Sequence, residues 1–337
     1  MMKFCFDSVF KEMMQSHNLD TVVILGHLNL DGDAAGSVMS LAHYIHVNYP
    51  QYKVLPYLAE TLERGPKKMV LKDKIFTPFK KPDTAGKPYG VIVCDNATLA
   101  RMIGLEYYQK ATASIVVDHH ASNEGYGDVN WTEVSEACAE NVYHMLDPKL
   151  LRKAAEAEVS PMAVDYIYLD IVHDTGEMAR AKESTLLALV NLMSMGVDHG
   201  EIMKTMHSDT LDVLNKRGDI IRSARREMDG KVAYVIMNAK ERDEKNVIYE
   251  DIHCVSTILR DCDDIEFGFT MYEESENVWR CSFRSDEKWI NVNELLKPFG
   301  GGGHVSAAGL KYETEDVEEL KNQILDRVVE LRSKEEK

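Results

Sequence analysis

Short apolar runs that end in acidic or imidazole side chains are the feature of this chain that most restricts its fold. They lie at residues 21–33, 91–95, 115–120 and 171–174. Up to about residue 190 such runs alternate with helical patterns, which predicts a largely parallel sheet with helices on both faces. Ligands bind at the carboxyl ends of the strands in such sheets, so these segments predict a site at that edge.

The pattern predicts an α/β protein with two domains. The first, at residues 1–190, carries the site. A helical connector at 191–228 joins it to a smaller α/β domain at 229–337, with an active-site cleft between the two domains. The expected strands are 21–27, 53–58, 90–95, 114–118, 232–237, 267–272 and 279–284, and the expected helices include 34–48 and 251–259.

Composition narrows the partners of the chain. Its 337 residues are 45% hydrophobic, which supports cores for two domains. The net charge of -17 leaves no basic track for long nucleic acid, although a small phosphorylated ligand still fits a local cationic cleft. No apolar stretch reaches membrane-spanning length, so a cytoplasmic location without membrane partners is expected. The cysteines show no Cys-x-x-Cys pair and predict neither zinc nor disulfides: Cys5, Cys94, Cys138, Cys254, Cys262 and Cys281.

The loop after the first run, Gly26-His27-Leu28-Asn29-Leu30-Asp31-Gly32-Asp33, has simpler interpretations than a metal site. A capped turn before a helix is one of them. A calcium loop is another, but Ala42 stands at the twelfth position counted from Asp31, where an EF-hand needs a glutamate. Asp95 and Asp174 could each be an ordinary residue at the end of an element. Taken together, the four segments favour a carboxylate and imidazole site for two divalent cations.

The C-terminal part contains a second candidate element. Gly300-Gly301-Gly302-Gly303-His304 precedes Ala307-Ala308-Gly309, and Arg284 lies upstream in Ser282-Phe283-Arg284-Ser285. Glycines let backbone N–H groups approach an anion closely. A flexible linker is the alternative for the glycine run, and an exposed strand residue is the alternative for the arginine.

These motifs resemble the DHH phosphoesterase superfamily with its DHH-associated C-terminal domain, and within it the nanoRNase and pAp phosphatase branch. The resemblance rests on the loop at 26–33, on Asp95, on Asp118-His119-His120, on Asp174-Thr175-Gly176 and on the element at 300–309. It implies two divalent metal ions, with manganese favoured by the mixed ligand set. One ion is held by His27 and Asp31, the other by Asp33, His119 and Asp174, and Asp95 bridges them.

The resemblance also implies the remaining roles. His120, Asp118 and Asp95 are the expected catalytic residues, with His120 at the attacked phosphate. The expected substrate-binding residues are Arg284, Ser285, Gly301, Gly302, Gly303 and His304.

The expected activity is hydrolysis of short oligoribonucleotides to mononucleotides, dephosphorylation of pAp to AMP, or both. The alternatives are a cyclic or linear dinucleotide phosphodiesterase, a pyrophosphatase and a non-catalytic nucleotide-binding regulator. A homodimer is compatible with this assignment. Two departures from the family pattern bear on the pocket: Leu30 replaces the usual proline, and Glu177-Met178-Ala179-Arg180 replaces an aromatic residue followed by arginine. Arg180 could act from a shifted position.

Overall fold

The structure, a computed structural model, describes residues 5–28, 32–157, 161–286 and 288–335. The chain divides into two compact units, Met1–Ser208 and Asp209–Lys337, and each is described by itself. The division falls inside the expected connector at 191–228. That segment supplies α9 (His199–His207) to the first unit and α10 (Leu211–Arg222) to the second.

The first unit contains the predicted parallel sheet. Within the described residues its strand order is β2-β1-β3-β4-β5, and every neighbouring pair is parallel. The predicted strands are confirmed with ends within one or two residues, and β5 is an additional short edge strand. The strands are β1 (Thr21–Leu25), β2 (Lys53–Tyr57), β3 (Gly90–Cys94), β4 (Ala113–Val117) and β5 (Val129–Trp131).

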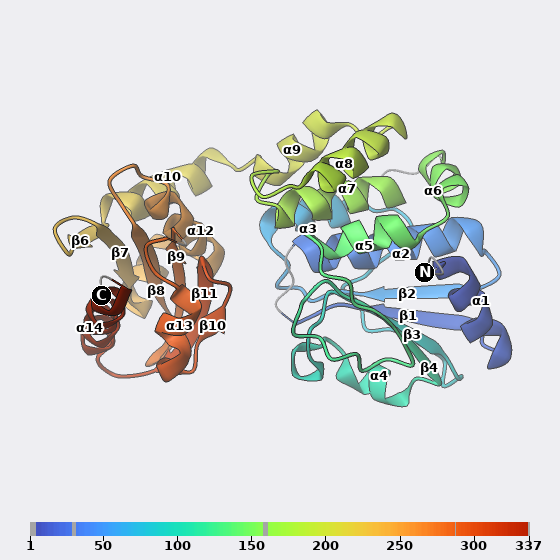
Figure 1. Ribbon diagram of the computed structural model, residues 1–337, viewed down its shortest axis with the longest axis horizontal. Helices are drawn as coiled ribbons and strands as arrows, with labels where there is room; N and C mark the ends of the chain where they lie inside the picture. Colours follow the sequence, from blue (N-terminus) through green and yellow to red (C-terminus); the bar gives the residue numbers. More distant parts are fainter. Residues whose placement is uncertain (1–4, 29–31, 158–160, 287, 336–337) are drawn as a thin grey trace. The chain divides into compact units, whose positions relative to one another are not determined.

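Helices cover both faces of this sheet, as the continuous apolar strands require. Figure 1 shows α2, α5 and α7 on one side and α4 on the other. Alternate residues of one strand enter different cores: Val22 and Ile24 belong to the core under α2, and Val23 and Leu25 to the core under α4. The helices are α1 (Phe6–Ser16), α2 (Gly32–Asn48), α3 (Arg64–Leu71), α4 (Leu105–Lys110), α5 (Cys138–Met145), α6 (Pro148–Ala155), α7 (Ala163–Asp174) and α8 (Glu183–Ser194).

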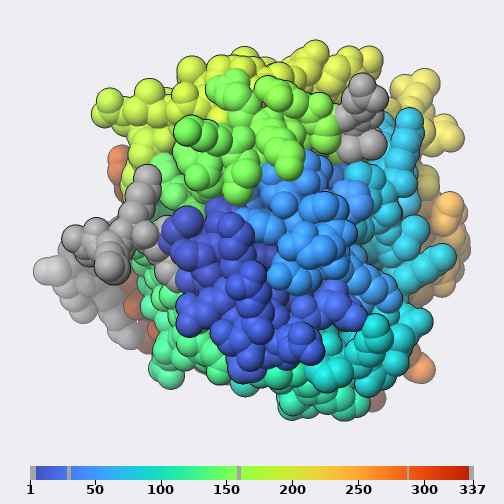
Figure 2. All heavy atoms as spheres, turned by 90° about the vertical axis from the view of Figure 1, so that its right-hand side faces the viewer, coloured from blue at the N-terminus to red at the C-terminus, as the bar shows by residue number. Residues whose placement is uncertain are grey.

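The N-terminal helix α1 closes one end of the first core. Figure 2 shows it in dark blue beside the lighter blue segment where α2 ends. The Phe10 ring lies 5.3 Å from the Tyr49 ring and 5.5 Å from the Tyr52 ring, measured between centroids. Such aromatic pairs anchor α1 to the segment between α2 and β2.

Helices α2 and α7 approach each other closely at Gly36. A Cβ atom there would lie 2.4 Å from the Asp170 Cβ atom and 2.6 Å from the Tyr166 carbonyl oxygen. Only glycine permits this approach without displacing a helix. The close crossing brings the N-terminal turn of α2, with Asp33, near the acidic residues of α7.

A buried contact between an imidazole and a carboxylate ties α2 to the segment after α3. His43 Nε2 lies 2.5 Å from Asp73 Oδ2, and both side chains are almost fully buried. Asp73 also accepts hydrogen bonds from the Tyr166 hydroxyl and from the N–H groups of Ile75 and Phe76. Burial alone would raise the pKa of Asp73, but His43 and these amides outweigh burial and lower it.

We expect Asp73→Asn to lower the free energy of unfolding by about 3–5 kcal/mol at neutral pH, because it leaves a buried imidazole without its charged partner. A carboxyl group with a lowered pKa stabilises the fold above its unfolded pKa of about 3.9, and this contribution is lost as the pH falls through the folded pKa. The difference between wild type and variant in urea unfolding should therefore shrink below about pH 4. A difference that stays constant with pH would contradict this role of the Asp73 carboxylate.

The second unit contains the other predicted strands, in a mixed sheet of order β10-β11-β9-β8-β7-β6 within the described residues. β7 and β8 are parallel, and the other pairs are antiparallel. The strands are β6 (Arg225–Glu227), β7 (Val232–Met237), β8 (Phe267–Ser275), β9 (Val278–Ser285), β10 (Gly302–Gly303) and β11 (Ala307–Glu313). The helices, besides α10, are α11 (Ala239–Lys245), α12 (Tyr249–Arg260), α13 (Val292–Leu296) and α14 (Val317–Glu335).

Strand β9 separates two different environments. Cys281 and Phe283 pack into the core formed with α13 and α14, whereas α12 packs on the opposite face of the sheet. Arg280, Ser282 and Arg284 alternate with the core residues along β9 and therefore face the α12 side. One face of this strand is thus apolar and the other is polar.

Candidate metal and phosphate site

The ends of three adjacent parallel strands deliver most of the predicted ligands to one edge of the first sheet. His27 follows β1, Asp95 follows β3 directly, and His119 lies two residues after β4. β1, β3 and β4 are neighbours in the strand order, so their carboxyl ends meet. The strand order therefore brings the residues that follow these three strands to the predicted edge.

Two helix ends add the remaining acids. Asp33 lies in the first turn of α2, and Asp174 ends α7. The segment at 171–174 is therefore helical, unlike the strand-ending runs before it. Asp31, the further expected ligand of the loop, and Leu30 lie outside the described residues.

Asp95 is the centre of a first group of side chains. Its Oδ2 atom lies 3.3 Å from His27 Nε2, and its Oδ1 atom lies 3.5 Å from both His119 Nε2 and His120 Nδ1. Asp95 is 2% exposed and has a left-handed backbone, with φ of 48°. A non-glycine residue in that conformation at a buried position is costly and is typical of functional sites.

His119 belongs also to a second group, with two further carboxylates. Its Nε2 atom lies 3.3 Å from Asp33 Oδ2 and 3.9 Å from Asp174 Oδ2. Asp95, His119 and His120 form one set whose ligand atoms lie within 4.8 Å of one another, and Asp33, His119 and Asp174 form another. The two groups share His119, whose Nε2 atom has a single lone pair and can therefore bind only one cation.

The residues present fit divalent cations. Asp95 Oδ1 is buried and has no hydrogen-bond partner among the described residues, as a ligand atom facing a cation would. His119 Nδ1 lies 3.1 Å from the Ser135 carbonyl oxygen, so Nδ1 carries a proton and Nε2 points at the carboxylates with a free lone pair in the neutral ring. An imidazole oriented in this way, beside three carboxylates, is an arrangement typical of metal ligands.

Several charged side chains of the site lie close together and shift one another's pKa values. Burial raises the pKa of Asp33 well above its usual value, and the charges of Asp170 and Asp95 add to the effect. Burial also lowers the pKa of His119, but Asp95 and Asp174 outweigh that effect and raise this pKa to about 10. The negative charge of these carboxylates therefore exceeds the nearby positive charge, and bound cations would balance it.

Asp118 contacts His120 and belongs to neither of the two groups. It is fully buried, and its Oδ1 atom lies 2.8 Å from His120 Nδ1. The amide of Asn123 donates to Oδ2 at 2.6 Å and also reaches the Asn96 carbonyl oxygen at 3.3 Å. These contacts fix the orientation of His120, whose side chain is 28% exposed.

The sequence analysis missed Asp170, a fully buried carboxyl group beside the site. The Ser37 hydroxyl donates to Oδ2 at 2.6 Å, and the Ala139 N–H donates to Oδ1 at 3.2 Å. Burial, reinforced by the charge of Asp95, raises the pKa of Asp170 well above its usual value. The only signal in the sequence is its spacing of four residues from Asp174, which puts both on one side of a helix.

The turn after Asp174 has an unusual backbone. Gly176, Glu177 and Met178 all have positive φ, and the Arg180 guanidinium donates to the Asp174 carbonyl oxygen. Glu177 also pairs with His207 at 3.1 Å. The hydrogen bond from Arg180 therefore ties this turn to the end of α7, where Asp174 lies.

The candidate substrate residues of the second unit converge through β11. Ala307 of β11 pairs with Arg284 of β9, and the His304 N–H donates to the Ala307 carbonyl oxygen at 2.8 Å. Gly302 and Gly303 form β10 on the other side of β11. Arg284, the glycine run and the exposed His304 thus all lie near the start of β11.

Two of the expected residues have internal packing roles. A Cβ atom on Gly303 would lie 2.5 Å from the Ala307 carbonyl oxygen, so glycine is needed there for strand pairing. Ser285 is fully buried, and its hydroxyl lies 3.0 Å from the carbonyl oxygens of Glu266 and Asp286.

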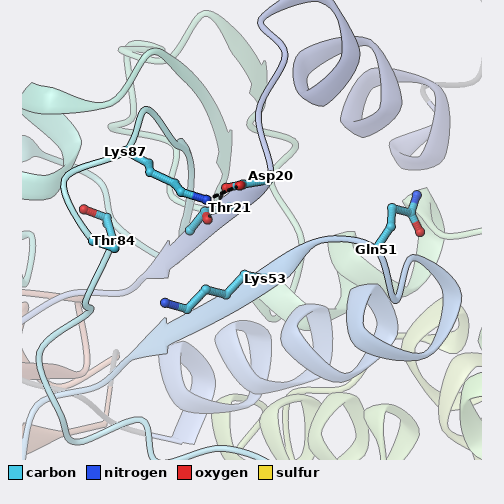
Figure 3. Close-up of a pocket in the computed structure, with 7 residues that line it drawn as sticks. Asp20, Thr21, Gln51, Lys53, Thr84 and Lys87 are labelled. Atoms are coloured by element: carbon cyan, nitrogen blue, oxygen red, sulfur yellow. Dashed lines mark hydrogen bonds and ion pairs between the residues drawn. The ribbon is translucent and has the colours of Figure 1, made fainter.

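A separate surface pocket lies near the amino end of β1 (Figure 3). Asp20, Lys53 and Lys87 are among its lining residues. Lys87 pairs with Asp20 at 2.8 Å, and Lys53 donates to the Asp83 carbonyl oxygen. The pocket lies at the amino ends of the strands, opposite the edge that gathers the acidic and imidazole residues.

Comparison with known proteins identifies the class of both units. Residues 21–173 match the DHH family, N-terminal domain, and residues 220–330 match the DHHA1 domain. The two matches together span well over half of the chain, so the chain belongs to the DHH family and carries its DHHA1 domain.

Individual relatives and one solved structure extend the comparison. The chain is 25% identical to the probable bifunctional oligoribonuclease and PAP phosphatase NrnA of Streptococcus mutans, over 90% of this chain and 94% of that protein. It is 22% identical to the cyclic-di-AMP phosphodiesterase PdeA of Listeria monocytogenes, over 92% of this chain and 47% of that protein. The crystal structure of an exopolyphosphatase-related protein from Bacteroides fragilis superimposes with a TM-score of 0.79 at 18% identity, covering 98% and 97% of the two chains, and supports the fold.

Among the residues that the structure describes, no helix is both long and apolar enough to cross a membrane.

Proposed function

We propose that this chain is a metal-dependent phosphoesterase that hydrolyses short oligoribonucleotides to mononucleotides and dephosphorylates pAp to AMP. The observation that carries the proposal is the convergence of His27, Asp33, Asp95, His119 and Asp174 at one sheet edge, with ligand atoms a few ångströms apart. The name of the Streptococcus relative, which aligns over nearly its whole length, supports this substrate class.

In this proposal Asp33, His119 and Asp174 would hold one cation, His27 and the expected ligand Asp31 would hold the other, and Asp95 would be a ligand shared by both. Bound divalent cations would supply Lewis-acid charge and activate water near neutral pH. Manganese suits a set that mixes imidazole and carboxylate ligands. Asp95 has a left-handed backbone, and its two carboxylate oxygens face His27 and His119.

His120 has the role of contacting the attacked phosphate. Its Nδ1 atom is held by Asp118, so its Nε2 atom is the one available to a ligand. Asp118 is then a positioning residue, because its carboxylate contacts His120 and Asn123 instead of the cation positions. The carboxylate also stabilises positive charge on the ring if the imidazole donates to a phosphate oxygen.

The second unit is proposed to supply nucleotide recognition through Arg284, His304 and the glycine run. Guanidinium groups and accessible backbone N–H groups are suited to phosphate oxygens. Ser285 is assigned a structural part in this proposal, because its hydroxyl is buried against carbonyl oxygens.

A substrate panel tests the proposal. With manganese present, pAp and di- to pentanucleotides should be turned over, and turnover should fall steeply for longer chains because the protein carries a net charge of -17. Cyclic di-AMP tests the candidate function suggested by the Listeria relative, and pyrophosphate tests a simpler phosphatase. Turnover restricted to cyclic di-AMP or to pyrophosphate would replace the proposed function, and digestion of long RNA at physiological salt would contradict the size limit.

Substitutions in the second unit test the division of roles. Arg284→Ala and His304→Ala should each lower kcat/KM for pAp and dinucleotides by about ten- to a hundredfold, because each removes a charge-assisted contact worth about 1.5–3 kcal/mol. Metal content should stay at the wild-type level in both variants. The comparison substrate is bis-p-nitrophenyl phosphate, which lacks a nucleotide. An equal loss on both substrates, or loss of metal, would contradict this division.

A further inference from the structure

The segment after β4 holds the residue that follows Asp95. The Tyr126 hydroxyl donates to the Asn96 carbonyl oxygen at 2.6 Å and accepts from the Asn96 side-chain amide (Nδ2) at 2.9 Å. The same amide donates to the Thr98 carbonyl oxygen at 2.8 Å. Asn96 is 1% exposed, and burial raises the pKa of Tyr126, so the hydroxyl stays protonated and can donate. One phenol therefore holds both the main chain and the side chain of Asn96.

A second amide from the same segment joins Asn96 to the residue that holds His120. Asn123 Nδ2 donates to the Asn96 carbonyl oxygen at 3.3 Å and to Asp118 Oδ2 at 2.6 Å. An amide nitrogen carries two hydrogens, so these two bonds use both of them. On the other side of the carboxylate, Asp118 Oδ1 lies 2.8 Å from His120 Nδ1. A single planar group therefore links the main chain beside Asp95 to the carboxylate that holds His120.

The loop that carries both side chains is folded by its own hydrogen bonds. The Asn123 N–H donates to the His120 carbonyl oxygen at 3.1 Å, and the Gly125 N–H donates to Asn123 Oδ1 at 2.8 Å. Gly125 has φ of 76°, which glycine adopts without strain. The Tyr126 ring packs on Tyr108 of α4, with centroids 5.7 Å apart. The two side chains are therefore presented from a fixed support.

The conformation of Asp95 explains why such a hold is needed. Its φ of 48° is unfavourable for a residue with a Cβ atom, and such backbones persist only where the surrounding contacts determine them. The Asp95 N–H donates to the Val117 carbonyl oxygen at 2.9 Å, and the bonds at Asn96 hold the chain on the other side. Without those bonds the backbone would relax and move the carboxylate away from His27 and His119.

We propose that Asn96, Asn123 and Tyr126 are positioning residues that hold the Asp95 carboxylate at a fixed distance from His120. They act through these two residues of the candidate site and not by touching cations or substrate. The proposal rests on the proposed function, in which Asp95 is a metal ligand and His120 contacts the attacked phosphate. A displacement of about 1 Å in a catalytic group can cost about a hundredfold in rate, so the loss of this link should be measurable.

Two conservative variants test the two parts of the link. Tyr126→Phe keeps the ring but removes the hydroxyl, so it loosens Asn96 and with it Asp95. It should weaken manganese binding by about tenfold or more, measured from the rise of the melting temperature with manganese concentration, because residues that orient metal ligands have effects of this size. Asn123→Ser keeps an oxygen that can accept from the Gly125 N–H but has no amide to join the two segments. It should lower kcat for pAp by about tenfold or more at saturating manganese, with a smaller change in KM.

Matched controls remove equivalent groups elsewhere in the first unit. Tyr107→Phe removes a hydroxyl that donates to a main-chain carbonyl oxygen at 3.1 Å, and Asn130→Ser removes an amide that donates to another at 2.7 Å. Both controls should keep the wild-type kcat and manganese affinity. If folded Tyr126→Phe and Asn123→Ser proteins behave like these controls, with at most a lower melting temperature, the three residues have a purely structural role and the proposal is overturned.

Manganese affinity separates this proposal from the proposed function, because it is measured without turnover. A protein that cleaves neither pAp nor dinucleotides would end the proposed function, whereas weaker manganese binding by Tyr126→Phe would still support the hold on Asp95. If Asn123→Ser does not fold, Tyr126→Phe decides, since it removes a single oxygen atom. A wild-type melting temperature that does not respond to manganese would overturn both proposals.

Discussion

Asp95→Asn should lower kcat/KM by about a thousandfold or more while the protein keeps its fold. The carboxylate of Asp95 is the group that contacts His27 through one oxygen and His119 through the other, so the amide removes the charge that the two candidate cation positions share. Asparagine is the appropriate substitution, because it adopts the left-handed backbone of this position more readily than alanine does. Activity, metal content and circular dichroism should be measured on the same preparation.

Asp20→Asn provides the control for this variant. Asp20 precedes β1 at the amino end of the sheet and pairs with Lys87 on the surface, far along the strand from His27. It should retain wild-type activity and metal content. An Asp95→Asn protein that is folded and nearly as active as wild type would rule out the shared-ligand role.

The sequence was sufficient to predict the strand positions of the first unit and the edge at which the candidate residues gather. Buried parallel strands are continuous apolar runs, so they can be recognised in the sequence. Their carboxyl ends meet at one edge of the sheet, where ligands bind, so the polar residues directly after the strands gather there. Asp174 was predicted as a site residue, with an ordinary helix-end residue as the alternative, and the structure places it at the end of α7. An apolar run of a few residues does not by itself distinguish a buried helix from a strand.

Residues whose function depends on tertiary contacts could not be found in this way. Asp170 becomes notable only because the close crossing at Gly36 places it beside Asp33. The contacts of Asn123 and Tyr126 require the segment after β4 to fold against the segment after β3, and no local pattern specifies such a pairing. Ser285 was predicted to bind substrate, and the structure adds contacts that the sequence does not specify: the end of β9 turns its hydroxyl toward carbonyl oxygens.

Metal removal should abolish activity, and it should reverse the effect of Asp33→Asn on the melting temperature. In chelator, wild-type protein should lose activity by about a thousandfold or more, and manganese should restore it. A ligand that binds only the folded state, present at 100 times its Kd, adds about 2.7 kcal/mol to the free energy of unfolding. The melting temperature should therefore rise with manganese concentration, which is a measurement independent of turnover.

Asp33→Asn separates charge repulsion from ligand loss in the same experiment. Burial and the neighbouring charges of Asp170 and Asp95 raise the pKa of Asp33, so ionising it disfavours the fold as the pH rises above the ordinary carboxyl pKa. An amide avoids this cost and can still accept the Cys138 N–H at Oδ1. In chelator at neutral pH the variant should melt at a higher temperature than wild type. In manganese it should melt at a lower one, because a ligand of the cation is lost. The same order of stability under both conditions would mean that Asp33 is not a metal ligand, since only bound cations make its negative charge favourable at a buried position.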